Sequence, residues 1–371
     1  MRVNWRTDRG TRNSFAALAA ACETAGITLR PVASPESDIT CYSLNSINAP
    51  RLLDEIRTAP CITIAGGPHA SARYREVAAA ADYVVVGEGE YVLPALITAI
   101  ESGTGTVPAG IATSGAYTPA NSCVWLDAYP PFSDIKGTIE LSRGCPHACG
   151  YCQTPQLFGH RMRHRSIDAV VRAARRYRDV RFVTPNAFAY GSDGRHPRFD
   201  RLETLLQKLE NDRIFLGTFP SEVRPEWVTD AALELVLQYC ANRRVHFGAQ
   251  SGSDAVLKAI RRGHTVADVI RAVERCRDHG LVPVVDIIVG LPFETDDDQQ
   301  ATIRLAAWIA RNGMVHAHYF TPLPGTPLEA TVARPLLPET KKTLGRLALA
   351  GKATGSWMEP EIRFFRQNQN G

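Results

Sequence analysis

Three cysteines in one short stretch offer the clearest chemistry in this 371-residue chain. They lie in the sequence Cys145-Pro-His-Ala-Cys149-Gly-Tyr-Cys152, directly after an apolar, strand-like run at residues 138–142. A 4Fe–4S cluster has four irons, so three thiolate ligands leave one iron free to bind another molecule. The spacing therefore predicts an iron–sulfur cluster with one open coordination site.

A zinc site is the alternative that the same residues allow. Zinc sites usually pair two C-x2-C knuckles, or complete the ligand set with a Cys or His at helical or hairpin spacing. His147 is the candidate fourth ligand here. The C-x3-C-x2-C spacing favours the cluster over zinc.

The remaining cysteines favour a reducing compartment over a disulfide framework, because the chain has nine cysteines, an odd number. We expect the six outside the loop to be small buried hydrophobic residues. They are Cys22, Cys41, Cys61, Cys123, Cys240 and Cys276.

Composition describes a chain long enough for two globular domains, with 44% hydrophobic and 22% charged residues. No apolar run approaches the length of a membrane span and the first residues lack a signal peptide's apolar stretch, so we expect a cytoplasmic protein. A net charge of +4 does not by itself imply nucleic acid. Eight arginines crowd residues 161–181; a solvated helix face explains them best, and a surface for an anionic substrate is the alternative.

Residues 1–115 alternate short apolar runs with helix-like stretches, which predicts a doubly wound parallel sheet of the Rossmann-like type. Such sheets bind ligands at the carboxyl ends of their strands. The segments at those ends are residues 43–45, 66–69 and 87–90. Neither G-x-G-x-x-G after the first strand nor a Walker motif is present, so dinucleotide or triphosphate binding is not supported.

A Gly-, Pro- and Ser-rich segment at residues 116–137 predicts a linker. After it, six strand-like runs alternate with helix-like stretches over residues 138–329, which predicts a partial (β/α)6, TIM-like barrel with its chemistry at the carboxyl ends of the strands. We expect residues 330–371 to form a helical cap and a frayed tail.

The motif C-x3-C-x-aromatic-C, with Tyr151 as its aromatic residue, resembles the signature of the radical S-adenosylmethionine (SAM) enzymes. The resemblance implies that the amino and carboxylate groups of SAM chelate the open iron. It also implies that the reduced cluster cleaves SAM to a 5′-deoxyadenosyl radical.

Three later stretches resemble the SAM-contacting strands of that family: SEVRP at 221–225, GAQSGSDAVLKAIRRGHT at 248–265 and VDIIVGLPFETDDD at 285–298. By this resemblance the SAM contacts are Tyr151, Ser221, Glu222, Arg224, Gln250, Ser251 and Gly290. Glu222 and Arg224 have the alternative of pairing with each other, and Gln250 that of satisfying a backbone group.

The segment after the second barrel strand places polar and aromatic residues where a substrate would approach the cluster. Asn186, Tyr190 and Asp193 are therefore the predicted substrate contacts. An ordered turn capped by Asn and Asp is the alternative explanation.

The sequence ITIAGGPHAS, followed by ADYVVVGEGEYVLPALI, resembles the cobalamin-binding domain that precedes many radical SAM domains. The cobalamin contacts that this resemblance implies are Ser43, Asn45, Gly66, Gly67, His69, Gly87, Glu88 and Gly89. The D-x-H-x-x-G motif is missing, so no histidine is expected to bind cobalt from below. His69 has the alternative of making one ordinary loop hydrogen bond.

Together these resemblances point to the short archaeal and bacterial group of cobalamin-binding radical SAM proteins. They imply a 4Fe–4S cluster, SAM and cobalamin as cofactors, and methyl transfer to an unactivated carbon as the reaction. The expected partners are a small-molecule or peptide substrate and a reductant such as flavodoxin or ferredoxin, with nucleic acid not expected.

Three other functions stay open. One is a cobalamin-dependent cyclase or redox reaction without methyl transfer. Another is a tRNA methylthiotransferase, although that branch carries a second three-cysteine set and a C-terminal RNA-binding barrel that this sequence does not show. The last is an iron–sulfur electron-transfer or cofactor-binding protein without catalysis, which would normally fill all four iron sites with cysteine.

Overall fold

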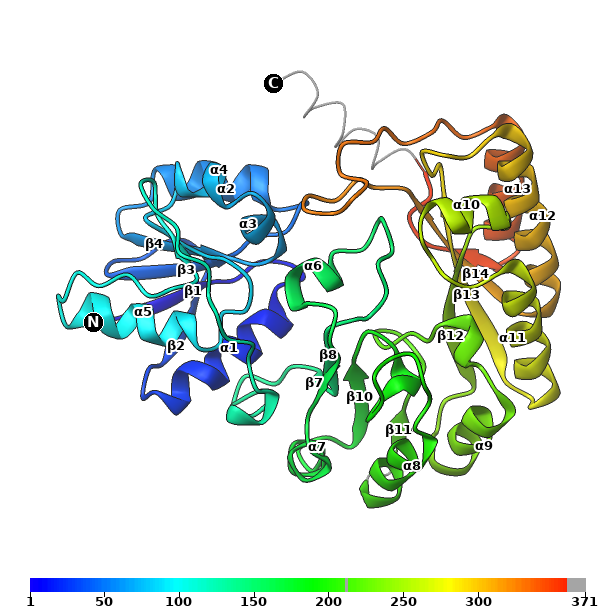
Figure 1. The fold of residues 1–371 in the computed structure, drawn as a ribbon, viewed down its shortest axis with the longest axis horizontal. Coiled ribbons are helices and arrows are strands. Elements are labelled where there is room, and N and C mark those ends of the chain that lie inside the picture. The colour runs from blue at the N-terminus through cyan, green and yellow to red at the C-terminus, as the bar shows by residue number, and fades with distance from the viewer. Residues whose placement is uncertain (211–212, 359–371) are drawn as a thin grey trace. The chain divides into compact units, whose positions relative to one another are not determined.

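The computed structural model describes residues 1–210 and 213–358, which divide into two α/β units (Figure 1). Unit 1 comprises residues 1–140, 153–159 and 163–176, and unit 2 comprises residues 141–152, 160–162 and the described residues from 177 onward. The units therefore do not divide at a single point in the sequence. The end of the predicted tail, residues 359–371, lies outside the described residues.

The predicted linker is part of unit 1, because arginines later in the chain bind its backbone. Arg165 donates hydrogen bonds to the carbonyls of Leu126 and Tyr129, the latter at 2.7 Å, and Arg176 donates to the carbonyl of Ser133. Unit 1 thus extends beyond the predicted boundary at residue 115 and takes in residues 116–137.

The elements of unit 1 are, in chain order, β1 (Val3–Arg6), α1 (Arg12–Thr24), β2 (Leu29–Val32), β3 (Ile39–Ser43), α2 (Ala49–Arg57), β4 (Ile62–Gly66), α3 (Pro68–Ala72), α4 (Tyr74–Ala78), β5 (Tyr83–Val85), α5 (Val92–Glu101), β6 (Ile111–Ala112), the 3-10 turn η1 (Leu126–Ala128), β7 (Ile139–Glu140), α6 (Thr154–Phe158), β9 (Arg163–His164) and α7 (Ile167–Ala174). The order of the sheet is β2-β1-β3-β4-β5-β6, with β6 antiparallel to β5 and the other pairs parallel.

Helices cover both faces of the unit 1 sheet, as the doubly wound prediction requires (Figure 1). Cys41 and Ile64 face the core formed with α1 and α5, whereas their neighbours Tyr42 and Ala65 face the core formed with α2, α3 and α4. Consecutive strand residues point to opposite faces, so strands buried on both sides are apolar throughout. The strand order places the topological switch, where ligands bind in such folds, between β1 and β3.

The elements of unit 2 are β8 (Ser142–Arg143), β10 (Asp179–Val183), η2 (Ala187–Ala189), α8 (Phe199–Lys208), β11 (Arg213–Phe215), η3 (Pro225–Trp227), α9 (Asp230–Tyr239), β12 (Arg244–Gln250), α10 (Asp254–Ala259), α11 (Val266–Asp278), β13 (Val282–Val289), α12 (Asp296–Asn312), β14 (Met314–Tyr319), α13 (Pro338–Leu349) and β15 (Ala353–Thr354).

Strands of unit 2 pair in parallel, β10 with β11 and then β12-β13-β14-β15. The two groups are linked because the His246 N–H donates to the Gly217 carbonyl at 2.8 Å and the Val223 N–H donates to the His246 carbonyl at 2.9 Å. Capping boxes at Thr265 and Thr295 begin α11 and α12, so α11 starts after the turn that follows α10 and α12 starts after the loop that follows β13. The mixed α/β fold with parallel strands confirms the predicted fold class.

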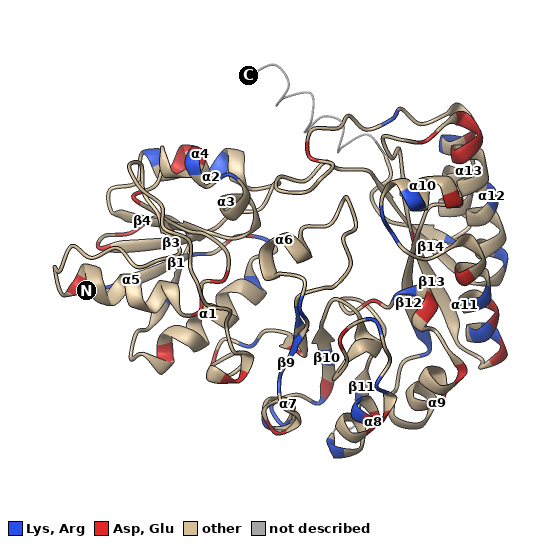
Figure 2. Ribbon diagram, viewed as in Figure 1, with Lys and Arg blue, Asp and Glu red and all other residues tan. Residues whose placement is uncertain are grey.

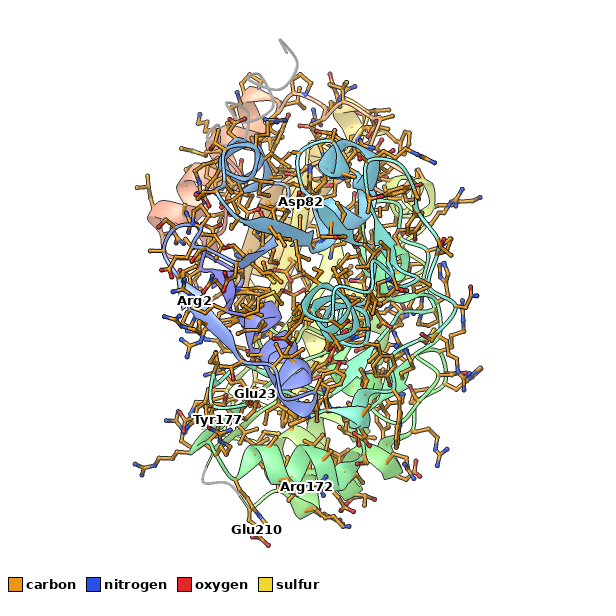
Figure 3. The ribbon with its side chains drawn as sticks, turned by 90° about the vertical axis from the view of Figure 1, so that its left-hand side faces the viewer. Arg2, Glu23, Asp82, Arg172, Tyr177 and Glu210 are labelled. Carbon is orange, nitrogen blue, oxygen red and sulfur yellow. The ribbon has the colours of Figure 1, made fainter. Side chains whose placement is uncertain are left out.

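Charged side chains of both signs are interspersed along the outer helices of unit 2, α11, α12 and α13 (Figure 2). Glu23, Arg172 and Glu210 are exposed and project outward from the ribbon (Figure 3). Arg172 therefore fits the solvated helix face that the arginine-rich segment predicted. Among the described residues, no helix combines the length and apolarity needed to cross a lipid bilayer.

Candidate functional site

The cysteine loop of unit 2 starts directly after β8 and is tied to two later segments of the same unit. Gly144 takes a φ of +85°, a conformation that favours glycine. The Gly150 N–H donates to the Ile260 carbonyl at 2.9 Å, and the Gly150 carbonyl accepts from the Leu328 N–H at 3.1 Å. A side chain at Gly150 would meet Leu328 at 3.1 Å, so the loop is closely packed where the chain turns between the cysteines.

His147, the candidate fourth ligand of a zinc site, already has a hydrogen-bond partner in the chain. Its Nε2 lies 3.2 Å from the Gly194 carbonyl, and burial with the Arg224 charge lowers the pKa of His147 to about 4. A zinc ion bound through this nitrogen would have to displace that contact.

Two guanidinium groups approach the central cysteine of the loop. Arg224 Nη1 lies 4.0 Å and Arg262 Nη1 3.8 Å from Cys149 Sγ. Arg224 is 4% exposed and also binds Glu226 Oε1 at 2.5 Å and the Arg262 carbonyl at 2.6 Å. A thiolate, or a cluster bearing negative charge, is stabilised by such neighbours.

Arg224 therefore supports the cysteine loop through its hydrogen bonds. Its ion-pair partner is Glu226 and not Glu222, the partner that the alternative explanation had named. Arg262, which the sequence prediction did not single out, has the same function and also donates to the Gly248 carbonyl at 3.0 Å. His264 follows on the same loop, and burial with the two arginine charges lowers its pKa to about 3. The stretch KAIRRGHT was the available signal for both residues.

Apolar packing holds the aromatic residue of the motif. Tyr151 packs against a core cluster that includes Leu257, Ile260 and Phe320, and burial raises the pKa of its hydroxyl. Ile288 on β13 joins the same cluster. The aromatic residue of the cysteine loop thus packs in a cluster that draws side chains from α10, from β13 and from the residue that follows β14.

The predicted SAM contacts at the ends of β12 and β13 lie in tight turns, where some of their polar groups already have hydrogen-bond partners. Gln250 has a φ of +70°, and Ser251 Oγ lies 3.2 Å from Thr302 Oγ1. Gly290 has a φ of +80°, and its N–H donates to Glu294 Oε2 at 3.1 Å. Burial raises the pKa of Glu294 to about 8, which keeps its carboxyl group protonated at neutral pH.

Ser221 and Glu222 lie on the strand-like segment between β11 and η3. The Ser221 hydroxyl is buried and has no hydrogen-bond partner among the described residues, so it is available to a ligand. Burial, followed by the charge of Asp286, raises the pKa of Glu222 to about 8. As SAM contacts these residues remain predictions.

The predicted substrate residues separate into two kinds. Asn186 is 4% exposed, and both polar atoms of its amide lack partners among the described residues. The Ala187 N–H donates to the Glu222 carbonyl at 2.9 Å, which places this loop beside the predicted SAM contacts. Tyr190 is fully buried, whereas Asp193 is exposed and accepts from the N–H groups of residues 195 and 196 at 2.8 Å each. Asp193 therefore caps a turn, as the alternative explanation had it.

Glycine turns at the carboxyl edge of the unit 1 sheet leave one histidine unsatisfied. Gly67 has a φ of +97°, and a side chain there would lie 2.7 Å from the Leu44 carbonyl. Both ring nitrogens of His69 are buried without a hydrogen-bond partner among the described residues, and burial lowers its pKa. The single loop hydrogen bond offered as the alternative for His69 is therefore not formed by the ring.

Other predicted cobalamin contacts form hydrogen bonds within the loops that carry them or to neighbouring segments. Asn45 Oδ1 accepts from the N–H groups of Ile47 and Asn48, and the Gly87 N–H donates to Ser71 Oγ at 2.9 Å. The Ser43 carbonyl accepts from the Asn48 amide at 3.1 Å. Contacts of these residues with a corrin remain predictions.

Glu88 forms an ion pair inside unit 1. Its carboxylate accepts two hydrogen bonds from the Arg163 guanidinium, at 2.6 and 3.0 Å, and one from the Val124 N–H at 2.9 Å. The neighbouring Gly89 has little free space, because a side chain there would meet Leu18 at 3.1 Å. Arg163 is therefore a structural residue and does not contribute a free charge to an anionic substrate.

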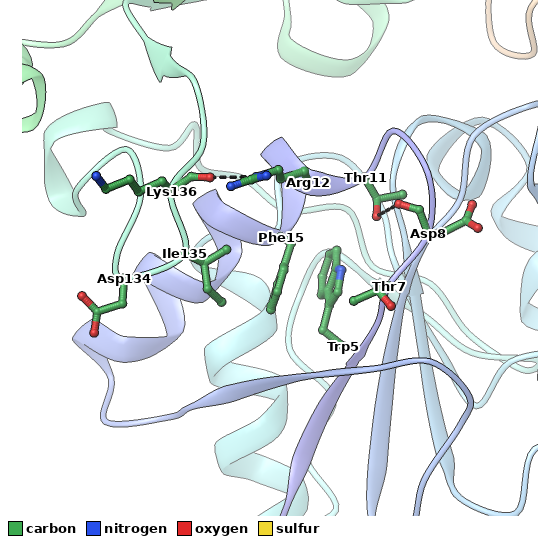
Figure 4. A pocket seen from close by; sticks show the side chains of 9 residues that line it. All are labelled: Trp5, Thr7, Asp8, Thr11, Arg12, Phe15, Asp134, Ile135 and Lys136. Carbon is green, nitrogen blue, oxygen red and sulfur yellow. Dashed lines mark hydrogen bonds between the residues drawn. The ribbon is translucent and has the colours of Figure 1, made fainter. Parts of the chain in front are cut away.

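A pocket of about 470 Å³ lies beside β1 and α1 in unit 1 (Figure 4). The Arg12 guanidinium donates to the Lys136 carbonyl at 3.0 Å across one side of it. The lining residues are Trp5, Thr7, Asp8, Thr11, Arg12, Phe15, Asp134, Ile135 and Lys136.

Comparisons with known proteins bear on the three-cysteine loop and on the strand–helix units that follow it. Residues 139–306 match the model of the radical SAM superfamily. The chain is 30% identical over 233 residues to the threonylcarbamoyladenosine tRNA methylthiotransferase MtaB of Thermotoga maritima, covering 57% of this chain and 51% of that protein. It is 31% identical over 213 residues to a tRNA-2-methylthio-N(6)-dimethylallyladenosine synthase of Geobacter sulfurreducens, covering 54% and 47%. The chain thus spans about half the length of the curated relatives it matches.

Two solved structures are similar in fold over most of the chain. The radical SAM methyltransferase TsrM from Kitasatospora setae, with cobalamin and a [4Fe-4S] cluster bound, has a TM-score of 0.67 at 17% identity, covering 88% of this chain and 77% of that one. The cobalamin-dependent radical enzyme OxsB, with aqua-cobalamin and SAM bound, has a TM-score of 0.62 at 17% identity, covering 82% and 51%.

Proposed function

We propose that this chain is a cobalamin-dependent radical SAM enzyme that transfers a methyl group to an unactivated carbon. The observation that carries the proposal is the cysteine loop, whose three cysteines and adjacent arginines suit an iron–sulfur cluster in a segment that matches the radical SAM superfamily model. The fold of unit 1, its glycine turns and its unsatisfied His69 support cobalamin as the second cofactor.

Each cofactor is assigned to residues whose chemistry fits it. Cys145, Cys149 and Cys152 would hold the cluster, which when reduced supplies the electron that cleaves SAM. Cobalamin at the carboxyl edge of the unit 1 sheet would supply the methyl group, since cofactors carry the chemistry that side chains cannot perform.

The chain's own residues bind and shield the reactants. Arg224 and Arg262 hold positive charge beside Cys149, and the apolar packing around Tyr151 excludes water from one side of the loop. Ser221 and Asn186 offer buried polar atoms without partners among the described residues, so they would bind SAM or substrate by hydrogen bonds.

The proposal is tested with protein reconstituted without oxygen, supplied with cobalamin, and freed of excess ligand. We expect the broad absorption of a cluster together with a cobalamin spectrum in equal amount, and 5′-deoxyadenosine after reduction with SAM. Cys149→Ala should lose the cluster and SAM cleavage, whereas Cys123→Ala, at an exposed cysteine of unit 1, should retain both. Retention of SAM cleavage by Cys149→Ala would overturn the assignment of the loop.

A tRNA methylthiotransferase is the second candidate, because the curated relatives at 30–31% identity carry that activity in their names. Against it, Cys22 and Cys41 lie in the apolar core of unit 1 at 0% and 2% exposure, and burial raises the pKa of both thiols. They are therefore poorly placed to hold a second cluster. Incubation with tRNA that carries threonylcarbamoyladenosine or N(6)-dimethylallyladenosine but no methylthio group, followed by mass spectrometry of its nucleosides, separates the two functions, since a 2-methylthio product would support the second.

A further inference from the structure

Three potential metal ligands lie side by side on neighbouring strands of unit 2. Strands β13 and β14 are neighbours in the sheet (Figure 1). Asp286 on β13 is the register partner of His316 on β14, and His318 follows two residues later, so all three share one face of the sheet. None of them belongs to the cysteine loop or to the predicted SAM contacts. The fold itself therefore assembles a set of two imidazoles and one carboxylate.

The ligand atoms of this set, here called the Asp286 site, converge at distances that a metal ion would impose. His316 Nδ1 lies 2.8 Å from Asp286 Oδ1 and 3.3 Å from His318 Nε2, and all three atoms lie within 4.8 Å of one another. Metal bonds of about 2.0–2.2 Å to nitrogen and oxygen place neighbouring ligands about 2.9–3.4 Å apart. The two observed distances are close to that range.

Hydrogen bonding alone does not account for this arrangement. A proton on His316 Nδ1 that is donated to Asp286 leaves that nitrogen with no lone pair for His318. Such an ion pair explains one of the two short contacts and leaves the lone pair of His318 Nε2 without a role. A cation between the three atoms would satisfy them together.

The Asp286 carboxylate strengthens the case for a cation. Asp286 is 6% exposed, and its Oδ2 has no hydrogen-bond donor among the described residues. A buried carboxylate oxygen without a donor costs free energy, which a bound cation would offset.

We propose that Asp286, His316 and His318 bind a divalent transition-metal ion. Imidazole with carboxylate suits zinc or ferrous iron, whereas calcium and magnesium prefer oxygen ligands alone. With three protein ligands the ion keeps a coordination position open for water or for a substrate atom. This site goes beyond the proposed function and does not depend on it.

The test uses cluster-reconstituted protein, dialysed against zinc ion and analysed for zinc and iron by mass spectrometry. We expect one zinc per chain in the wild type, and affinity at least about 100-fold lower in His318→Ala, beyond the 10- to 100-fold that loss of an outer-shell partner costs. Asp286→Asn keeps the side-chain shape and should also weaken binding. The control is His160→Ala, at an exposed histidine outside the site, which should bind zinc like the wild type.

Two results would overturn the site. One is zinc affinity that is unchanged in both His318→Ala and Asp286→Asn; the other is zinc retention that depends on the cysteine loop alone. Cluster absorption and SAM cleavage are measured on the same preparations. Zinc loss with an intact cluster supports the site, and failure of the cluster itself concerns only the proposed function.

Discussion

Gly290, at the end of β13, is the position where a single methyl group should be most informative. Its φ of +80° costs an alanine about 1–2 kcal/mol, because a Cβ clashes with its own backbone in this region. The new Cβ would also lie 2.7 Å from Tyr319 Cε2 and 2.8 Å from the Arg334 carbonyl oxygen. The Tyr319 hydroxyl donates to that same carbonyl at 3.0 Å, so the ring cannot move away without losing this bond.

Overpacking of this kind adds about 1–3 kcal/mol to the cost of Gly290→Ala. Gly280→Ala is the matched control, since its φ is +69° and no atom lies within 4 Å of the added Cβ. Both variants place an alanine at a positive φ and therefore carry the same kind of backbone cost. Only in Gly290→Ala does the new Cβ also contact packed neighbours. The difference between them isolates the packing contribution.

Hydrogen exchange of peptides from β13 and β14, followed by mass spectrometry, measures the effect locally in unit 2. Relative to Gly280→Ala, we expect exchange in Gly290→Ala to be faster by about 5- to 150-fold, since each 1.4 kcal/mol is a factor of ten. Urea unfolding of both variants provides the global comparison. Equal exchange in the two variants would refute the reasoning, because the contacts of the new methyl group would then cost nothing.

Three further predictions concern charged side chains. Glu294→Gln should flatten the pH dependence of stability. In the wild type, burial raises the folded-state pKa of Glu294 from 4.5 to about 8, so the free energy of unfolding should fall as pH rises between these values, by up to about 1.4 kcal/mol per pH unit. Urea unfolding at several pH values should show this fall in the wild type and not in the variant. Arg163→Met should lower the unfolding midpoint of unit 1, because it breaks the ion pair with Glu88, and should leave substrate affinity unchanged. An unchanged midpoint with weaker substrate binding would instead support a substrate role for this arginine. Arg262→Met should make the reduction potential of the cluster more negative in an electrochemical titration, with exposed Arg261→Met as the control, and equal potentials would contradict the role given to Arg262.

The fold was largely predictable because its strands are long apolar runs between clear turn signals. The strand-like runs predicted over residues 138–329 include β13 (Val282–Val289), and the helical cap expected over residues 330–371 includes α13 (Pro338–Leu349). The strands β6 and β15 were missed, since each has two residues and exists through its pairing partner. Local sequence pattern carries no information on such partners.

The candidate site was predictable where one motif contains it, as in the cysteine loop. Arg262 and the Asp286 site were missed because they depend on residues far apart in sequence that the parallel register brings together. The arginine-rich segment also misled in part, since Arg163 and Arg165 hold backbone and carboxylate groups of unit 1. Whether an arginine is exposed to solvent or bound to other groups depends on the residues that lie beside it in the fold, and composition does not reveal them.

The return of residues 163–176 to unit 1 sets an order on biosynthesis. The backbone at Leu126, Tyr129 and Ser133 meets its arginine partners only after they too have been translated, later than the cysteine loop. Domains of a nascent chain normally fold in the order of their synthesis. In this chain the last residues of unit 1 are synthesised after the cysteine loop of unit 2. A ribosome that stalls at residue 140 therefore holds a nascent chain that is long enough for a domain but still lacks residues 163–176, which unit 1 needs to be complete.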